Sequence, residues 1–95
     1  MADPTKDNAD IGTSSAEIVG ANTLRNGVLL FNEGSEDVWL GFGEDAEANK
    51  GAKVPAGGSI TLLYNGEPSG AYNQFIKAIN GIAASGTNTV AYQEV

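Results

Sequence analysis

The sequence predicts an all-β protein: a single small antiparallel β-sandwich, jelly-roll-like, with a flexible N-terminal arm and at most one short helical turn. Two observations lead to this prediction. Short runs rich in Val, Ile, Leu and aromatic residues recur along the chain, separated by Gly, Asn, Ser and Pro. The segment TNTVAYQEV, residues 87–95, alternates in character with a period of two, as a strand with one solvated face does.

The chain of 95 residues forms one domain, because a chain of this length buries too little surface to support two cores. Residues 1–15 have hardly any apolar side chains, and such a segment cannot bury enough surface to order itself. We therefore expect an N-terminal arm over residues 1–15 that is flexible or ordered by a partner. The β-sandwich domain is expected over residues 16–95.

Five segments are expected to be strands, and turn-forming residues between them set their limits. They cover residues 16–24, 26–33, 37–43, 59–64 and 88–95. In the second segment, Val28 and Leu30 point to one face while Leu29 and Phe31 point to the other, so both faces are apolar. Such a strand lies centrally in a sandwich, or its second face meets another chain.

The segment NEGSED, residues 32–37, favours a turn between the second and third of these strands. Gly34 adopts turn conformations without strain, and the neighbouring Asn, Ser and Asp side chains can satisfy the bent backbone. We therefore expect residues 28–42 to form a β-hairpin.

One segment, YNQFIKAI at residues 72–79, has the apolar spacing of a helix, with Phe75, Ile76 and Ile79 on one side. Glycines at positions 70 and 81 limit it to one or two turns.

The composition argues against most enzyme chemistry. The chain has no cysteine and no histidine, which removes disulfides, thiolate metal sites, the commonest metal ligand and the usual general base. We therefore predict that the protein is not an enzyme, with no catalytic residues, no cofactor and no resident metal.

The formal net charge is −7, and ten of the twelve carboxylates lie in residues 1–50. An acidic surface repels phosphate backbones and anionic lipid headgroups, so we expect neither nucleic-acid nor membrane binding. No apolar run approaches the roughly 20 residues that span a bilayer, and the polar N-terminus is unlike a signal peptide. We expect a soluble protein made and kept inside the cell. The acidic residues either keep it soluble or dock on a basic partner.

The segment GFGEDA, residues 41–46, fits the glycine pattern of a dinucleotide-binding loop. That loop must lead directly into a helix, whereas Gly51, Pro55, Gly57 and Gly58 follow here. Its carboxylates would also repel a diphosphate. We therefore do not expect a nucleotide site.

The carboxylate pairs Glu36/Asp37 and Glu44/Asp45 raise the question of acid–base chemistry or calcium binding. Adjacent residues of a strand point to opposite faces, and the chain has no calcium-loop pattern, so solvated acidic turns are expected.

Aromatic residues suggest a further hypothesis, a carbohydrate-binding module, because an aromatic face complements the apolar face of a pyranose. In a small sandwich, however, a Trp between Val38 and Leu40 is more often a core or interface residue. The aromatic residues concerned are Trp39, Tyr64, Tyr72 and Tyr92.

Three stretches, RNGVLLFNEGSEDVWLGFG, GAKVPAGGSITL and KAINGIAASGTNTVAYQEV, together resemble a group of small structural proteins of tailed bacteriophages. The shared pattern is a strand from Arg to Asn, a strand ending in Phe-Gly, a Gly-Gly turn, and a closing A-x-S-G-T before a final strand ending in Glu. The resemblance covers about residues 22–95. The matching positions are Arg25, Asn32, Phe42, Gly43, Gly51, Gly57, Gly58, Ile82, Ala83, Ser85, Gly86, Thr87 and Glu94.

The resemblance implies a β-sandwich on the virion. From it we predict a capsid decoration (cement) protein, a homotrimer that binds the major capsid protein on the outer surface of the phage head and bridges capsid subunits. It would be synthesised in the bacterial host cytoplasm. A minor neck, tail or fibre-associated virion protein is the alternative, because residues 66–78 and the acidic arm depart from the simplest pattern. The predicted partner-binding residues are Ile11, Ile18, Val19, Leu29, Phe31 and Trp39.

Overall fold

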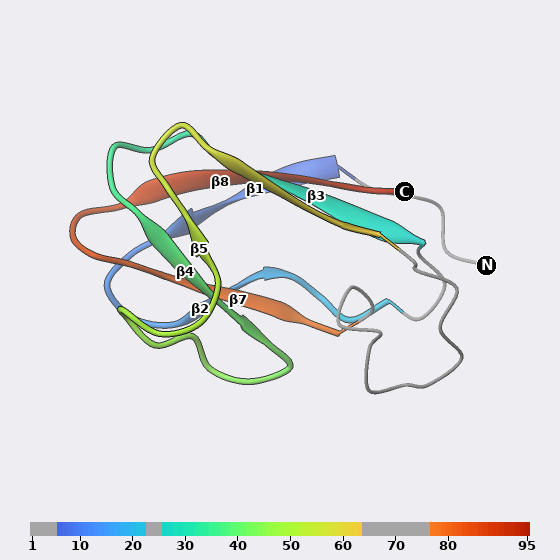
Figure 1. The fold of residues 1–95 in the computed structure, drawn as a ribbon, viewed down its shortest axis with the longest axis horizontal. Coiled ribbons are helices and arrows are strands. Elements are labelled where there is room, and N and C mark those ends of the chain that lie inside the picture. Colours follow the sequence, from blue (N-terminus) through green and yellow to red (C-terminus); the bar gives the residue numbers. More distant parts are fainter. Residues whose placement is uncertain (1–5, 23–25, 64–76) are drawn as a thin grey trace.

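The computed structural model describes residues 6–22, 26–63 and 77–95, and these residues form eight strands and no helix (Figure 1). Accordingly, these ranges contain no helix long and apolar enough to cross a membrane. The strands are β1 (Lys6–Ile11), β2 (Ala16–Val19), β3 (Gly27–Asn32), β4 (Val38–Phe42), β5 (Lys53–Val54), β6 (Ser59–Leu63), β7 (Ile79–Ala83) and β8 (Asn88–Glu94).

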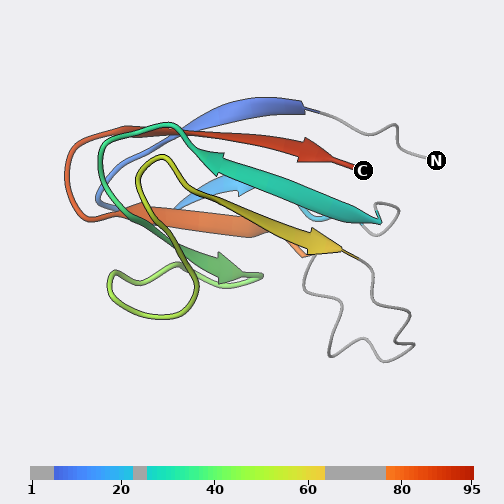
Figure 2. The same cartoon turned by 45° about the horizontal axis from the view of Figure 1, so that its top comes forward.

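The strands form two antiparallel sheets of four strands each. We call them the β3 sheet, in the order β1-β8-β3-β6, and the β4 sheet, in the order β2-β7-β4-β5. Figures 1 and 2 show them as two facing layers. Apart from β4 and β5, strands that follow one another in the chain lie in different sheets. An eight-stranded sandwich wound in this way is a jelly roll, so the predicted fold class is confirmed.

The core lies between the two sheets and takes alternate side chains from most strands; in β2 the pairing is irregular, and both Ile18 and Val19 are buried. In β3, Val28 and Leu30 are fully buried, whereas Leu29 is partly exposed and Phe31 points into solvent. The alternation predicted for the last strand is also present, since Asn88, Val90 and Glu94 are buried. Burying one Val, Leu or Ile side chain contributes about 1.5–3 kcal/mol, so these inward rows hold the sheets together. The core residues are Ile11, Ile18, Val19, Val28, Leu30, Val38, Leu40, Val54, Ile79, Ala83 and Val90.

The hairpin predicted for residues 28–42 is wrong. β3 pairs with β6 and β8, and β4 pairs with β5 and β7, so the two strands lie in opposite sheets. The segment between them turns the chain as expected, but it crosses from one sheet to the other. Each strand carries one fully apolar row, and two such rows are buried most completely when they face each other across the core.

Two buried asparagines fix this crossing. The side-chain amide of Asn32 donates to the carbonyl oxygens of Glu36 (2.7 Å) and Val54 (3.0 Å). Its Oδ1 accepts from the N–H of Gly34 at 3.0 Å, and Oδ1 of Asn88 accepts from the N–H of Glu36 at 3.0 Å. A Cβ atom at Gly34 would collide with the Asn88 side chain, so only glycine fits this position.

Several positions of the phage-protein pattern have structural roles. The N–H of Asn32 donates to the carbonyl oxygen of Gly58, and the N–H of Gly57 donates to that of Asn32, both at 2.9 Å. The end of β3 and the Gly-Gly turn therefore form one hydrogen-bonded unit. At the end of β8, Glu94 is buried and its Oε2 accepts from the side-chain amide of Asn22 at 3.1 Å. These pattern residues explain how the chain folds rather than what it binds.

The N-terminal arm predicted over residues 1–15 differs from the structure. Lys6–Ile11 form β1, an edge strand paired with β8 from Lys6 opposite Gln93 to Ile11 opposite Asn88. Ile11 is fully buried, and Ala9 packs against the core. The sandwich therefore begins at residue 6 rather than 16, and residues 1–5 lie outside the described residues. Polar composition was misleading, because an edge strand needs apolar side chains only at its inward positions.

Strand β7 was not expected, because its sequence INGIA has a glycine at the centre and Ile79 also fits a helical spacing. Gly81 is buried, and a Cβ atom there would lie 2.8 Å from Cδ1 of Ile18 and 3.2 Å from Cγ1 of Val38. The glycine thus lets the core side chains pack against the β7 backbone. Of the helical turn predicted for residues 72–79, residues 72–76 lie outside the described residues, and Ile79 belongs to a strand.

Candidate functional site

Three of the six predicted partner-binding residues lie in the core. Ile11 is 0% exposed, and Ile18 and Val19 are each 5% exposed. They point between the sheets, so a partner could contact them only if the sandwich opened. The sequence pattern could not show this, because the strand that carries Ile11 was taken for an arm. The remaining three predicted residues lie on the outer faces of the sandwich.

Leu29 and Phe31 lie together on the outer face of the β3 sheet. Phe31 is 42% exposed, although it is in the middle of a sheet and not at a loop tip. It stands opposite Ala91 of β8 on one side and Ser59 of β6 on the other. Together with the partly exposed Leu29 it gives this face two neighbouring apolar side chains, which make it a candidate binding surface.

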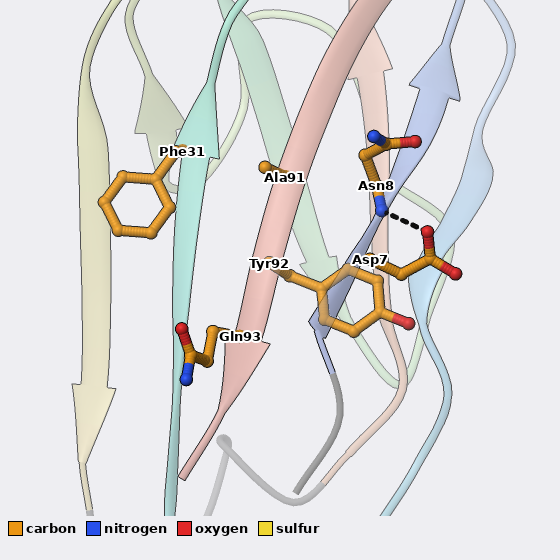
Figure 3. A pocket seen from close by; sticks show the side chains of 6 residues that line it. All are labelled: Asp7, Asn8, Phe31, Ala91, Tyr92 and Gln93. Carbon is orange, nitrogen blue, oxygen red and sulfur yellow. Dashed lines mark hydrogen bonds between the residues drawn. The ribbon is translucent and has the colours of Figure 1, made fainter.

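A shallow groove runs across this face from Phe31 to β1, with a volume of about 320 Å³. Figure 3 shows Ala91 of β8 between Phe31 on β3 and Asn8 on β1, with the Phe31 ring inclined toward β6. We call it the Phe31 groove. It is lined by Asp7, Asn8, Phe31, Ala91, Tyr92 and Gln93.

The polar side chains of the Phe31 groove are exposed and uncharged except for Asp7. Oδ1 of Asp7 accepts from the N–H of Asn8 at 2.8 Å, which orients the carboxylate along β1 (Figure 3). In the part of the chain that the structure describes, the side-chain amides of Asn8 and Gln93 form no hydrogen bond with the protein. Their donors and acceptors therefore point to solvent and are available to a ligand.

Trp39 lies on the opposite side of the sandwich, on the outer face of the β4 sheet. It is partly buried and stands opposite Ile82 of β7 and Lys53 of β5. Nζ of Lys53 lies 3.7 Å from Oδ2 of Asp37, an ion pair at the surface that contributes little to stability. We call Trp39, Ile82 and Lys53 the Trp39 strip. It presents two apolar side chains beside one cation.

The loop after GFGEDA is acidic and leads to β5 without a helix, as expected. Glu44, Asp45, Glu47 and Lys50 line a hollow of about 150 Å³ beneath it. Nζ of Lys50 is 3.8 Å from Oε1 of Glu47, and both side chains are largely exposed. Within the described ranges, no three side chains of metal-binding type are grouped to hold an ion. The loop is tied to the sandwich by the side-chain amide of Asn80, which donates to the carbonyl oxygen of Glu44 at 2.6 Å.

The aromatic platform considered for sugar binding is not formed as the sequence suggested. Trp39 belongs to the β4 sheet and Tyr92 to the β3 sheet, so these two side chains cannot share one surface. Tyr64 and Tyr72 lie outside the described residues. Sequence analysis missed the Phe31 groove because β1 was not recognised as a strand. Two signals were present: the second apolar face of residues 28–31, which carries Phe31, and the period of two in β8, which puts Ala91 and Gln93 on one face.

No family model, curated protein or solved structure matches the chain. The functional proposal therefore depends on the fold, the two outer faces and the phage-protein resemblance.

Proposed function

We propose that the chain is a bacteriophage capsid decoration (cement) protein, which binds the outer surface of the assembled head and stabilises it by bridging capsid subunits. The resemblance over residues 22–95 supports this proposal. The fold is also compatible with it, because jelly rolls are common among viral capsid domains. On this proposal the partner is the major capsid protein, and the protein is made in the bacterial cytoplasm before it reaches the head.

The Trp39 strip carries the proposal, and we assign the contact with the shell to it. Trp39 and Ile82 are neighbours on a regular sheet face, where a flat partner surface can reach both. Tryptophan is among the residues most often found at the energetic centre of protein interfaces. Lys53 adds an apolar stem and a charge at the edge of the strip, and docking would complete the burial of the Trp39 ring.

A protein that binds the assembled shell but not the free subunit stabilises the shell by mass action. Each contact can be shallow, provided that one particle engages several capsid subunits at once. We therefore propose a homotrimer, in which three copies present three Trp39 strips around one symmetry axis. This arrangement uses flat surfaces and needs no deep pocket.

The test is binding of the purified protein to phage shells that lack it, measured by co-sedimentation. Trp39→Ser should weaken binding by at least about 30-fold, the loss expected for a residue at the centre of an interface. Phe31→Ser is the matched control, because it removes an aromatic side chain from the opposite face. Melting curves of both variants establish that they are folded. Equal binding by wild type and Trp39→Ser would exclude the Trp39 strip as the docking surface.

The position on the virion is tested separately from the surface used. A minor neck, tail or fibre component is present in a few copies per particle, whereas a decoration protein is present in a fixed, simple ratio to the major capsid protein. Failure of the wild-type protein to bind any shell preparation would contradict the decoration proposal itself.

A further inference from the structure

We propose that the Phe31 groove is a saccharide-binding site, in which a pyranose ring of a neutral sugar lies on Phe31 and its hydroxyl groups bond to Gln93 and Asn8. This activity goes beyond shell binding and uses the other face of the sandwich. A chain docked through the Trp39 strip leaves the β3 sheet on the side away from the shell.

The first argument is the exposed aromatic ring. Phe31 is 42% exposed, and its cross-strand neighbour Ala91 is too small to cover it. In Figure 3 the ring lies between β3 and β6, and Ala91 is on the other side of β3. The C–H face of a pyranose is apolar and flat, and it gains from contact with an aromatic ring in the way that other apolar surfaces do. The groove volume of about 320 Å³ is at the small end of ligand sites, which suits one or two sugar rings.

The second argument is the set of hydrogen-bonding groups around that ring. Asn8, Gln93 and Phe31 lie on the same outer face of the sheet, and the side-chain amides of Asn8 and Gln93 each offer donors and an acceptor. A sugar hydroxyl both donates and accepts, so these side chains can each meet a hydroxyl. Asn8 stands across Ala91 from Phe31, and Gln93 lies on the neighbouring strand (Figure 3). A ligand that extends from the ring across β8 would therefore reach first Gln93 and then Asn8.

The third argument is charge, which selects among ligand classes. The whole chain carries a formal charge of −7, and among the side chains that the structure describes the groove lining includes one carboxylate, that of Asp7. The net negative charge of the chain disfavours phosphorylated or carboxylated ligands. A purely apolar partner would leave the amides of Asn8 and Gln93 without partners once they were covered. A neutral polyhydroxyl compound carries no negative charge and can form hydrogen bonds with both amides.

The experiment is a titration of the full ¹⁵N-labelled chain with methyl glucoside, methyl galactoside and N-acetylglucosamine, followed by amide NMR shifts. A short oligosaccharide of each sugar is tested in parallel. The proposal predicts saturable shifts centred on β1, β3 and β8 with at least one of these probes at or below about 20 mM, the range in which millimolar dissociation constants are measured. Phe31→Ala and Gln93→Ala should each weaken that binding by about tenfold. Trp39→Ala is the matched control and should leave the affinity unchanged.

The outcomes separate this inference from the proposed function. Shifts centred on the Trp39 strip, or binding that survives both Phe31→Ala and Gln93→Ala, would overturn the assignment to the groove. No shift with any probe would overturn saccharide binding, whatever the shell-binding result. Because Gln93 is an exposed side chain, its variant tests the groove even if Phe31→Ala does not fold. Shell binding through Trp39 is measured by co-sedimentation with phage shells, so its result does not depend on the result of the saccharide titration.

Discussion

Strand β1 provides a sharp test of the fold, because it is the segment whose composition is least like that of a strand. The substitution Ile11→Ala removes a fully buried side chain from it. If residues 6–11 belong to the sandwich, this change leaves a cavity between the sheets. If they are an arm ordered only by a partner, the isolated protein loses nothing.

The expected loss follows from the burial of Ile11. Substituting a buried Ile by Ala costs about 2–5 kcal/mol, and an edge strand can partly relax into the space, so we expect about 2–3 kcal/mol. In a domain of this length each kcal/mol lowers the melting temperature by about 4–8 °C. Ile11→Ala should therefore melt about 10–20 °C below the wild type.

The assay is thermal unfolding followed by circular dichroism, with Asp10→Ala as the matched control. Asp10 is the preceding residue of the same strand, but its side chain is exposed, so its removal should change stability by no more than about 0.5 kcal/mol. Deletion of residues 1–15 should destabilise the protein more than Ile11→Ala, since it removes the whole strand. Identical melting curves for wild type and Ile11→Ala would refute the assignment of β1 to the sandwich.

Three further substitutions test the crossing between the sheets and the surface. Asn32→Ala removes three hydrogen bonds of a buried side chain and should cost roughly 3 kcal/mol, measured by urea unfolding. Gly34→Ala forces a Cβ atom against the Asn88 side chain and should lower the melting temperature by several degrees. Lys53→Gln removes only the exposed ion pair with Asp37 and should change the free energy of unfolding by less than about 0.5 kcal/mol.

A matched control variant and a contradicting outcome can be stated for these substitutions. Gly12→Ala is matched to Gly34→Ala, because a Cβ atom there meets nothing closer than the carbonyl oxygen of Gly86 at 3.7 Å. Equal stability of the two glycine variants would show that Asn88 does not restrict position 34. An unchanged urea midpoint for Asn32→Ala would show that its hydrogen bonds do not hold the crossing. A loss of 2 kcal/mol or more, about 30-fold in the folding equilibrium, on Lys53→Gln would mean that the surface ion pair matters more than exposure suggests.

The sequence predicted the fold class well where alternation was clear. The two-faced pattern of Val28 to Phe31 and the alternation in β8 are both present in the structure. The pairing of strands was not predictable from the same signals. A turn at Gly34 is visible in the sequence, but whether the chain returns in the same sheet or crosses depends on how two distant apolar rows pack.

Strands β1 and β7 were not predicted from the sequence, each for a different physical reason. Strand β1 was not predicted because its composition is polar; only Ala9 and Ile11 need to be apolar, since they face the core. Strand β7 was not predicted because it has a glycine at its centre. That glycine is required because the Ile18 side chain closely approaches the β7 backbone. The candidate surfaces depended on these strands. Leu29, Phe31 and Trp39 were predicted as partner-binding residues, but their division between opposite faces could be seen only once the sheets were known.

The measurement that tests the proposed function most directly is the copy number of this protein relative to the major capsid protein in purified particles of the phage that encodes it, by quantitative mass spectrometry. We predict a ratio near one or a fixed simple fraction of it, as a lattice of decorating trimers requires. A handful of copies per particle would instead indicate a neck or tail component. Absence from the particle would contradict a structural role in the virion.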